Sequence, residues 1–182
     1  LYKFFNDKFG YEAKRDPMYG ERLSKAEKWD AEYDTFTEDE VEDLFSYLPH
    51  SVPRLKPEHT LSHLYNSATK GDFSTLLDAT LVDIASLNAE TFSVTTSGKS
   101  KVNIFFPLTT YVTDTQKRDE FAKSLMRNVA SFNFEDVFDE KYDFFSRIFE
   151  HLLKGFNNAG GGNYAEYYTP RAIAQVMARV LV

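Results

Sequence analysis

Apolar side chains recur three or four residues apart along most of this chain. That spacing places them on one face of an α-helix and is the primary sequence signal of secondary structure. The stretches that show it are 1–9, 41–48, 73–87, 121–129, 145–156 and 173–181. Residues 92–106 change instead to the two-residue period of a strand. The sequence therefore predicts a mainly α-helical fold with one small β-hairpin.

Two of the predicted helices have recognisable boundaries. Thr37 and Glu40 have the spacing of a capping box, and Pro49 is expected to end the helix that follows them. Asp72 is the expected N-cap of the helix over 73–87. The acidic residues around the capping box favour a surface helix, since they suit the positive end of its dipole. An acidic docking surface is the second interpretation of the same residues.

The predicted hairpin consists of two alternating stretches around a polar loop, 97–101. Its apolar positions are Phe92, Val94, Val102, Ile104 and Phe106. A lone hairpin is marginally stable in water, so we expect it to lie against helices.

Composition narrows the class of protein. The chain has 182 residues with 21 Lys+Arg against 28 Asp+Glu, and its net charge of −7 is unlike that of a typical nucleic-acid binder. Nearly all of that charge lies in residues 1–50, which carry −6, against +1 for 51–130 and −2 for 131–182. Zero Cys excludes a disulfide scaffold, a thiolate zinc site and a Cys nucleophile. No apolar run approaches the ~18 residues that span a bilayer, and we expect a cytoplasmic protein without membrane contact.

A pair of histidines is the most obvious candidate for metal binding. His59 and His63 stand four residues apart, so one helix would place both rings on the same face. The metalloprotease motif has Glu directly after its first His, but Thr60 stands there, and no third ligand is evident. We therefore predict polar surface or interface histidines and no metal site.

Three consecutive glycines, Gly160 to Gly162, could suggest a phosphate-binding loop. A P-loop continues with Gly-Lys-Ser/Thr, whereas Asn163 and Tyr164 follow here. A dinucleotide fingerprint follows a strand, whereas the stretch before these glycines, 145–156, has helical periodicity. Residues 159–162 are thus expected to be a glycine-rich linker between domains.

The segment Glu166–Arg171 begins the last predicted helix. Thr169 is a favoured N-cap and Pro170 a favoured first helical residue. The apolar positions expected to form the buried face of this helix are Ile173, Val176, Met177, Val180 and Leu181. A helix start is the simpler interpretation. A ligand-binding site is the alternative interpretation. A helix N-terminus attracts anions, and Tyr167 and Tyr168 offer aromatic surface to a flat or cationic ligand.

These residues resemble a known family. The run from Gly161 to Met177, centred on Tyr168-Thr169-Pro170-Arg171, is similar to the start of the catalytic domain of type I restriction-modification M subunits, which are adenine-N6 DNA methyltransferases. Residues 142–153 resemble that family's last N-terminal helix. The opening residues, with the pair Asn6-Asp7, resemble its first-helix motif.

The resemblance implies a helical N-terminal domain (1–158), the linker (159–162) and the start of a truncated Rossmann-like methyltransferase domain (163–182). That domain binds S-adenosylmethionine in the family. The family's glycine-rich cofactor loop and its Asn-Pro-Pro-aromatic motif are missing from the chain. We therefore expect a fragment with no catalytic residues, no activity and weak or no cofactor binding. The residues implied to line part of the cofactor pocket are Glu166, Tyr167, Tyr168, Thr169, Pro170 and Arg171.

The partners that the resemblance implies are a specificity subunit, a second M subunit, a nuclease subunit and double-stranded DNA. Candidate DNA contacts are Lys99, Lys101, Lys117, Arg118, Lys123 and Arg127, although those on a helix fit a solvated face equally well. A free-standing helical protein-interaction module is the alternative function. A small independent enzyme is disfavoured, because no nucleophile, base and orienting group occur together.

Overall fold

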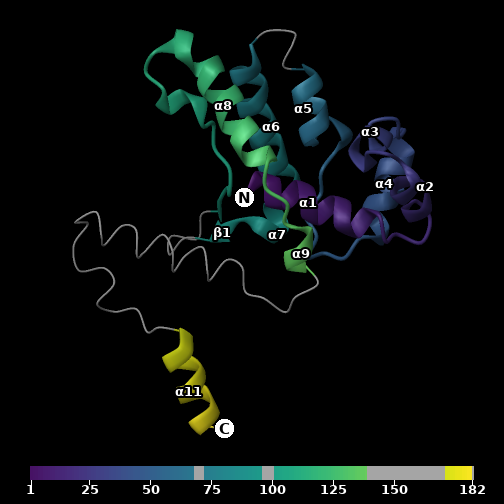
Figure 1. Cartoon of the computed structure of the whole chain (residues 1–182), viewed down its shortest axis with the longest axis vertical. Helices are drawn as coiled ribbons and strands as arrows, with labels where there is room; N and C mark the ends of the chain where they lie inside the picture. Colours follow the sequence, from purple (N-terminus) through teal and green to yellow (C-terminus); the bar gives the residue numbers. More distant parts are fainter. Residues whose placement is uncertain (68–71, 96–100, 139–170, 182) are drawn as a thin grey trace. The chain divides into compact units, whose positions relative to one another are not determined.

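The computed structural model describes residues 1–67, 72–95, 101–138 and 171–181 (Figure 1). The chain divides into two compact units, Leu1–Phe138 and Asp139–Val182. The described residues are mainly helical with one two-stranded sheet, which confirms the predicted fold class. None of the described helices is long and apolar enough to cross a membrane. The predicted linker, 159–162, and the predicted helix over 145–156 lie outside the described residues.

The first unit contains helices joined by short turns and connectors. Its α-helices are α1 (Tyr2–Ala13), α2 (Gly20–Lys25), α3 (Trp29–Tyr33), α4 (Glu38–Tyr47), α5 (Leu61–Ser67), α6 (Phe73–Leu87), α7 (Ala89–Phe92), α8 (Arg118–Ala130) and α9 (Glu135–Phe138). Its 3-10 turns are η1 (Pro57–His59), η3 (Thr109–Tyr111) and η4 (Thr115–Lys117). Its strands are β1 (Val94–Thr95) and β2 (Lys101–Val102), and the second unit contributes α11 (Arg171–Leu181).

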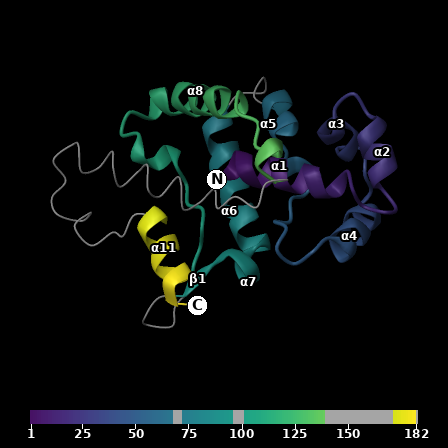
Figure 2. The same ribbon diagram turned by 60° about the horizontal axis from the view of Figure 1, so that its bottom comes forward.

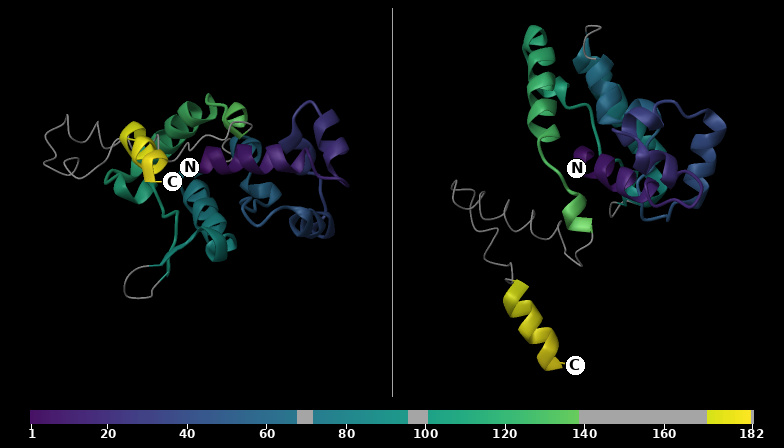
Figure 3. Two further views of the ribbon diagram at one scale, coloured as in Figure 1. Left: turned by 90° about the horizontal axis from the view of Figure 1, so that it is seen from below. Right: turned by 45° about the vertical axis from the view of Figure 1, so that its right-hand side comes forward.

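Helix α1 is the centre of the first unit. Figure 3 shows it running from the N-terminus to the group formed by α2, α3 and α4. Phe9, fully buried, packs on Tyr33 of α3 at a ring-centroid distance of 5.1 Å. Nearer the N-terminus, Phe5 packs on Phe92 and Phe105 at 5.0 and 5.5 Å. The helix predicted for the first residues is confirmed. Core residues toward both of its ends pack against other segments of the unit.

Helices α6 and α8 pack side by side (Figure 1, Figure 2). The predicted bounds of α6 are confirmed, and Asp72 occupies its N-cap position. Its carboxylate, however, accepts a hydrogen bond from the Thr75 hydroxyl, at 2.8 Å. Asp119 of α8 accepts from the Ser74 backbone N–H instead, at 2.9 Å. The α6 N-terminus is therefore capped by a neighbouring helix.

The buried face of α8 differs from the predicted one. The sequence pattern placed the apolar residues Phe121, Leu125 and Val129 in line on one face of this helix. Ala122 and Met126 are the buried residues, whereas Phe121 is 42% exposed. Leu125 and Val129 are half-buried, so the buried face of α8 is shifted from the predicted stripe toward Ala122 and Met126.

The capping box of α4 is confirmed. The Thr37 hydroxyl accepts from the Glu40 N–H at 3.3 Å, and the Glu40 carboxylate accepts from the Thr37 N–H at 2.9 Å. Val41 and Leu44 are buried, as the periodicity predicted, and the helix ends before Pro49.

The hairpin is confirmed but is shorter than predicted. The two strands are antiparallel, with Val94 opposite Val102 and Thr95 opposite Lys101. Phe92 belongs to α7 and not to a strand. The strands are short because of side-chain packing. The Phe92 and Phe105 rings pack against Phe5 of α1, so these residues do not continue the β-ladder. The expectation that the hairpin is supported by helices agrees with these ring contacts.

Candidate functional site

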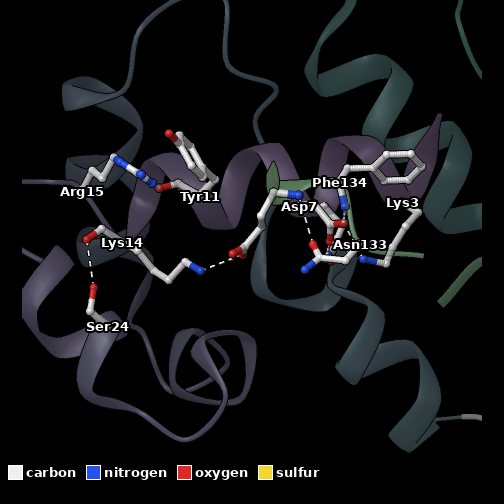
Figure 4. Close-up of polar contacts among 10 residues, drawn as sticks. Lys3, Asp7, Tyr11, Lys14, Arg15, Ser24, Asn133 and Phe134 are labelled. Carbon is white, nitrogen blue, oxygen red and sulfur yellow. Dashed lines mark hydrogen bonds and ion pairs between the residues drawn. The ribbon is translucent and has the colours of Figure 1, made fainter. Parts of the chain in front are cut away.

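Polar side chains of α1 bind backbone groups of two later segments. The Asp7 carboxylate accepts a hydrogen bond from the Phe134 N–H at 3.1 Å and pairs with Lys3 at 2.5 Å (Figure 4). Asn6 Oδ1 accepts from the N–H of Leu61, the first residue of α5, at 3.0 Å. Asn6, Asp7 and Lys3 are all buried. The Asn-Asp pair that resembles a family motif therefore has a structural role here.

The segment before and within α9 is held along α1 by aromatic and ionic contacts. The Phe4 ring packs edge-on against Phe134 and Phe138, with centroids 5.9 and 5.2 Å away. Lys14 Nζ lies 2.7 Å from the carboxylate of Glu135. These contacts fasten the last described segment of the first unit to its first helix.

The two histidines do not lie on one helix. His59 ends η1, whereas His63 belongs to α5. His63 Nδ1 is 2.7 Å from Asp34 and the residue is half-buried. His59 is only 1% exposed, so the predicted surface position is wrong for it. The cause is a partner on α6, because His59 Nε2 lies 2.8 Å from Asp83 Oδ2.

Glu58, His59 and Asp83 bring possible ligand atoms within 4.8 Å of one another, so the structure supplies the third ligand that the sequence did not reveal. The hydrogen bonds nevertheless oppose a metal. His59 Nδ1 accepts from the Lys56 N–H at 3.2 Å, so the proton of the neutral ring is on Nε2 and is donated to Asp83. A metal on Nε2 would place that proton on Nδ1, facing another donor.

This cluster is better described as a clamp between η1 and α6. Burial lowers the pKa of His59 below its ordinary value, although the Asp83 carboxylate acts in the opposite direction. Partial burial acts to raise the pKa of Asp83, but its hydrogen bond to His59 and the nearby Lys56 lower it overall. Both pKa shifts therefore favour a neutral His59 that donates a hydrogen bond to an ionised Asp83.

Several of the candidate DNA-contact residues already interact with other groups of this chain. Lys117 pairs with Asp114 at 3.4 Å. Lys123 pairs with Asp119 at 2.7 Å. The Arg118 Nε donates to a backbone carbonyl at 3.0 Å. Lys101 and Arg127 are exposed, and Lys99 lies outside the described residues. The pairs on η4 and α8 agree with a solvated face, and DNA contact stays a prediction.

The predicted cofactor segment lies almost wholly outside the described residues. Glu166, Tyr167, Tyr168, Thr169 and Pro170 belong to that undescribed part, and Arg171 is the first residue of α11. The helix expected directly after Thr169 and Pro170 is therefore present.

The burial predicted for the apolar stripe of α11 is wrong within the described part of the chain. Its members Ile173, Val176, Met177 and Val180 are 52%, 61%, 53% and 78% exposed. Helix α11 is the one described element of the second unit, so no described residue of that unit covers the stripe.

Residues 140–182 match the N-6 DNA methylase family. The match includes the segment Glu166–Arg171 and helix α11, and it covers about a quarter of the chain. It supports a relationship of this chain to adenine DNA methyltransferases. The chain matches no curated protein and no solved structure.

Proposed function

We propose that this chain is the N-terminal part of an adenine-N6 DNA methyltransferase, the modification subunit of a type I restriction-modification system. The match to N-6 DNA methylases over residues 140–182 carries the proposal. It falls on the segment whose residues independently resemble the start of the catalytic domain of those subunits. The finer assignment to type I systems rests on that resemblance.

S-adenosylmethionine supplies the methyl group in this proposal. Glu166 to Arg171 would line part of its pocket, with Thr169 as the best single contact. Helix α11 begins at Arg171, and the free N–H groups of a first helical turn favour a carboxylate such as that of the cofactor's methionine end. The complete enzyme would flip the target adenine out of the duplex, because its exocyclic nitrogen cannot be attacked within the stack.

The first unit would serve docking to the specificity subunit, the second M subunit and the nuclease subunit, and would clamp DNA. Its described buried polar groups support a scaffold role, since they join helices to one another. Asn6 and Asp7 hold two segments on α1, and His59 holds η1 on α6.

The test uses the full gene product that contains this chain, produced with its cognate specificity subunit. We expect transfer of a labelled methyl group from S-adenosylmethionine to adenine N6 in duplex DNA. Thr169→Ala should weaken cofactor binding by about 1–2 kcal/mol, or roughly five- to thirtyfold, in calorimetry. Thr113→Ala, an exposed threonine of the first unit, is the matched control and should change nothing.

The absence of N6-methyladenine after incubation of the complete assembly would contradict the assignment. Equal cofactor affinities of the Thr169 and Thr113 variants would contradict the assigned contact. The 182-residue chain alone should show no methyl transfer, and micromolar cofactor binding by it would overturn the expectation of an incomplete pocket.

A further inference from the structure

A groove of about 600 Å³ lies between α4 and the segment that forms η1 and α5. Its apolar floor comes from three parts of the first unit and is made of Phe36, Val41, Phe45, Pro57 and Leu87. These residues are buried or half-buried. Its rim is mainly acidic and consists of Asp34, Glu38, Glu42 and Glu58, with Lys56 and His63.

The basic side chains of the rim, Lys56 and His63, already have partners, but three of its carboxylates do not. Lys56 lies 3.4 Å from Asp83, and His63 lies 2.7 Å from Asp34. Among the residues that the structure describes, none forms a hydrogen bond or an ion pair with the exposed side chains of Glu38, Glu42 and Glu58. The rim therefore carries uncompensated negative charge above an apolar floor.

The helix dipole accounts for Glu38, which lies in the first turn of α4, but it does not account for Glu42 and Glu58. Glu40 serves the capping box and also pairs with Arg22 at 2.9 Å. Glu42 lies beyond the first turn of α4, and Glu58 belongs to η1. Glu38 and Glu42 stand four residues apart, where like charges destabilise a helix. Residues 1–50 carry a net charge of −6, which strengthens the negative field around the groove.

We propose that this groove binds a basic amphipathic segment of a protein partner. Lysine or arginine side chains of that segment would pair with Glu38, Glu42 and Glu58, while an apolar side chain between them enters the floor. An apolar floor with a charged rim is the usual arrangement for a docked helix. The acidic rim repels phosphate, so nucleic acid is disfavoured as the occupant. The inference does not depend on the relationship to methyltransferases.

The test measures fluorescence anisotropy of a short labelled peptide of lysine and leucine in helical spacing, titrated with the 182-residue chain. We expect binding that weakens with added salt, since rim pairs are exposed to solvent. Glu42→Gln combined with Glu58→Gln should weaken binding roughly three- to thirtyfold. Glu27→Gln combined with Glu120→Gln is the matched control, because both residues are exposed and outside the groove, and it should bind like the unchanged chain.

Nuclear magnetic resonance of the labelled chain should show peptide-induced shifts centred on α4 and residues 57–63. Equal affinities of the two double variants would overturn the proposal, as would shifts centred elsewhere. Equal binding of a peptide with glutamate in place of lysine would show that charge is not recognised. Displacement of the peptide by duplex DNA would identify a nucleic-acid surface instead.

Discussion

Short polar side chains of the first unit bind backbone groups far away in the sequence. Asn88 accepts from the Arg54 N–H at 2.7 Å and donates to the Arg54 carbonyl at 2.8 Å. Asp78 accepts from the N–H groups of Leu108 and Thr109 at 2.7 and 3.1 Å. Such contacts satisfy helix ends and irregular connectors, whose buried backbone groups would otherwise lack partners. They explain how connectors without regular structure are held on the helices.

The clamp formed by His59 predicts a pH dependence. Its pKa in the folded chain lies below the ordinary 6.5, so the unfolded chain binds more protons once the pH falls toward and below that value. The free energy of unfolding should therefore decrease as the pH falls from about 7.5 to about 5.5. Urea unfolding at several pH values measures this, and His59→Gln should flatten the dependence.

His50→Gln is the control, because His50 is exposed on the connector, and it should keep the slope of the unchanged chain. Equal slopes for the His59 variant and the unchanged chain would contradict the assignment. Asp83 acts in a separate range, since a lowered carboxyl pKa adds stability that is lost only as the pH falls below the ordinary 3.8.

At the scale of elements, the contact between α1 and α3 depends on one glycine. Gly10 is in the interior of α1, where glycine costs about 1 kcal/mol relative to alanine. A Cβ at this position would lie 2.4 Å from Trp29 Cε2. The missing side chain therefore makes room for the indole ring against the helix.

We predict that Gly10→Ala destabilises the chain by about 1–3 kcal/mol, despite its better helix propensity, because the Trp29 ring must move. Urea unfolding gives the measurement. In a Trp29→Leu background the same substitution should be neutral or stabilising, which a double-mutant cycle would show as coupling. A stabilised Gly10→Ala chain with Trp29 intact would refute the steric argument.

At the scale of the whole molecule, the described hydrophobic core lies entirely within the first unit. Its members extend from Tyr2 to Met126, and Phe134, just before α9, and Phe138, within it, pack on Phe4 of α1. The second unit contributes no described residue to this core. The first unit therefore contains the contacts that a folded domain requires.

We predict that a shortened chain of residues 1–138 folds cooperatively, with helical circular dichroism and a urea midpoint close to that of the 182-residue chain. A chain of residues 1–130 is the matched comparison. It lacks the Phe134 and Phe138 rings on Phe4 and the N–H that binds Asp7, so its midpoint should be lower. Failure of 1–138 to unfold cooperatively would show that the core needs the second unit.

Local signals predicted the longer described helices, which are α1, α4, α6, α8 and α11, but not the short ones between them. The capping box of Thr37 and Glu40 acts within one turn, and the periodicity of 73–87 matches the bounds of α6. The segment Glu166–Arg171 and its family relationship also follow from consecutive residues, and the match over 140–182 agrees with them. Each of these signals depends on side chains within a few residues of one another, so it can be recognised in the sequence without knowledge of the fold.

Only the tertiary structure decided which groups meet. The burial of His59 depends on Asp83, 24 residues later, and the role of Asp7 depends on Phe134, 127 residues later. The face that α8 buries was decided by packing, which covers Ala122 and Met126 and leaves Phe121 exposed. The acidic groove likewise joins α4 to η1 and α5. Sequence periodicity specifies a helix and its apolar side, but the partner of each side chain is chosen by packing between distant segments.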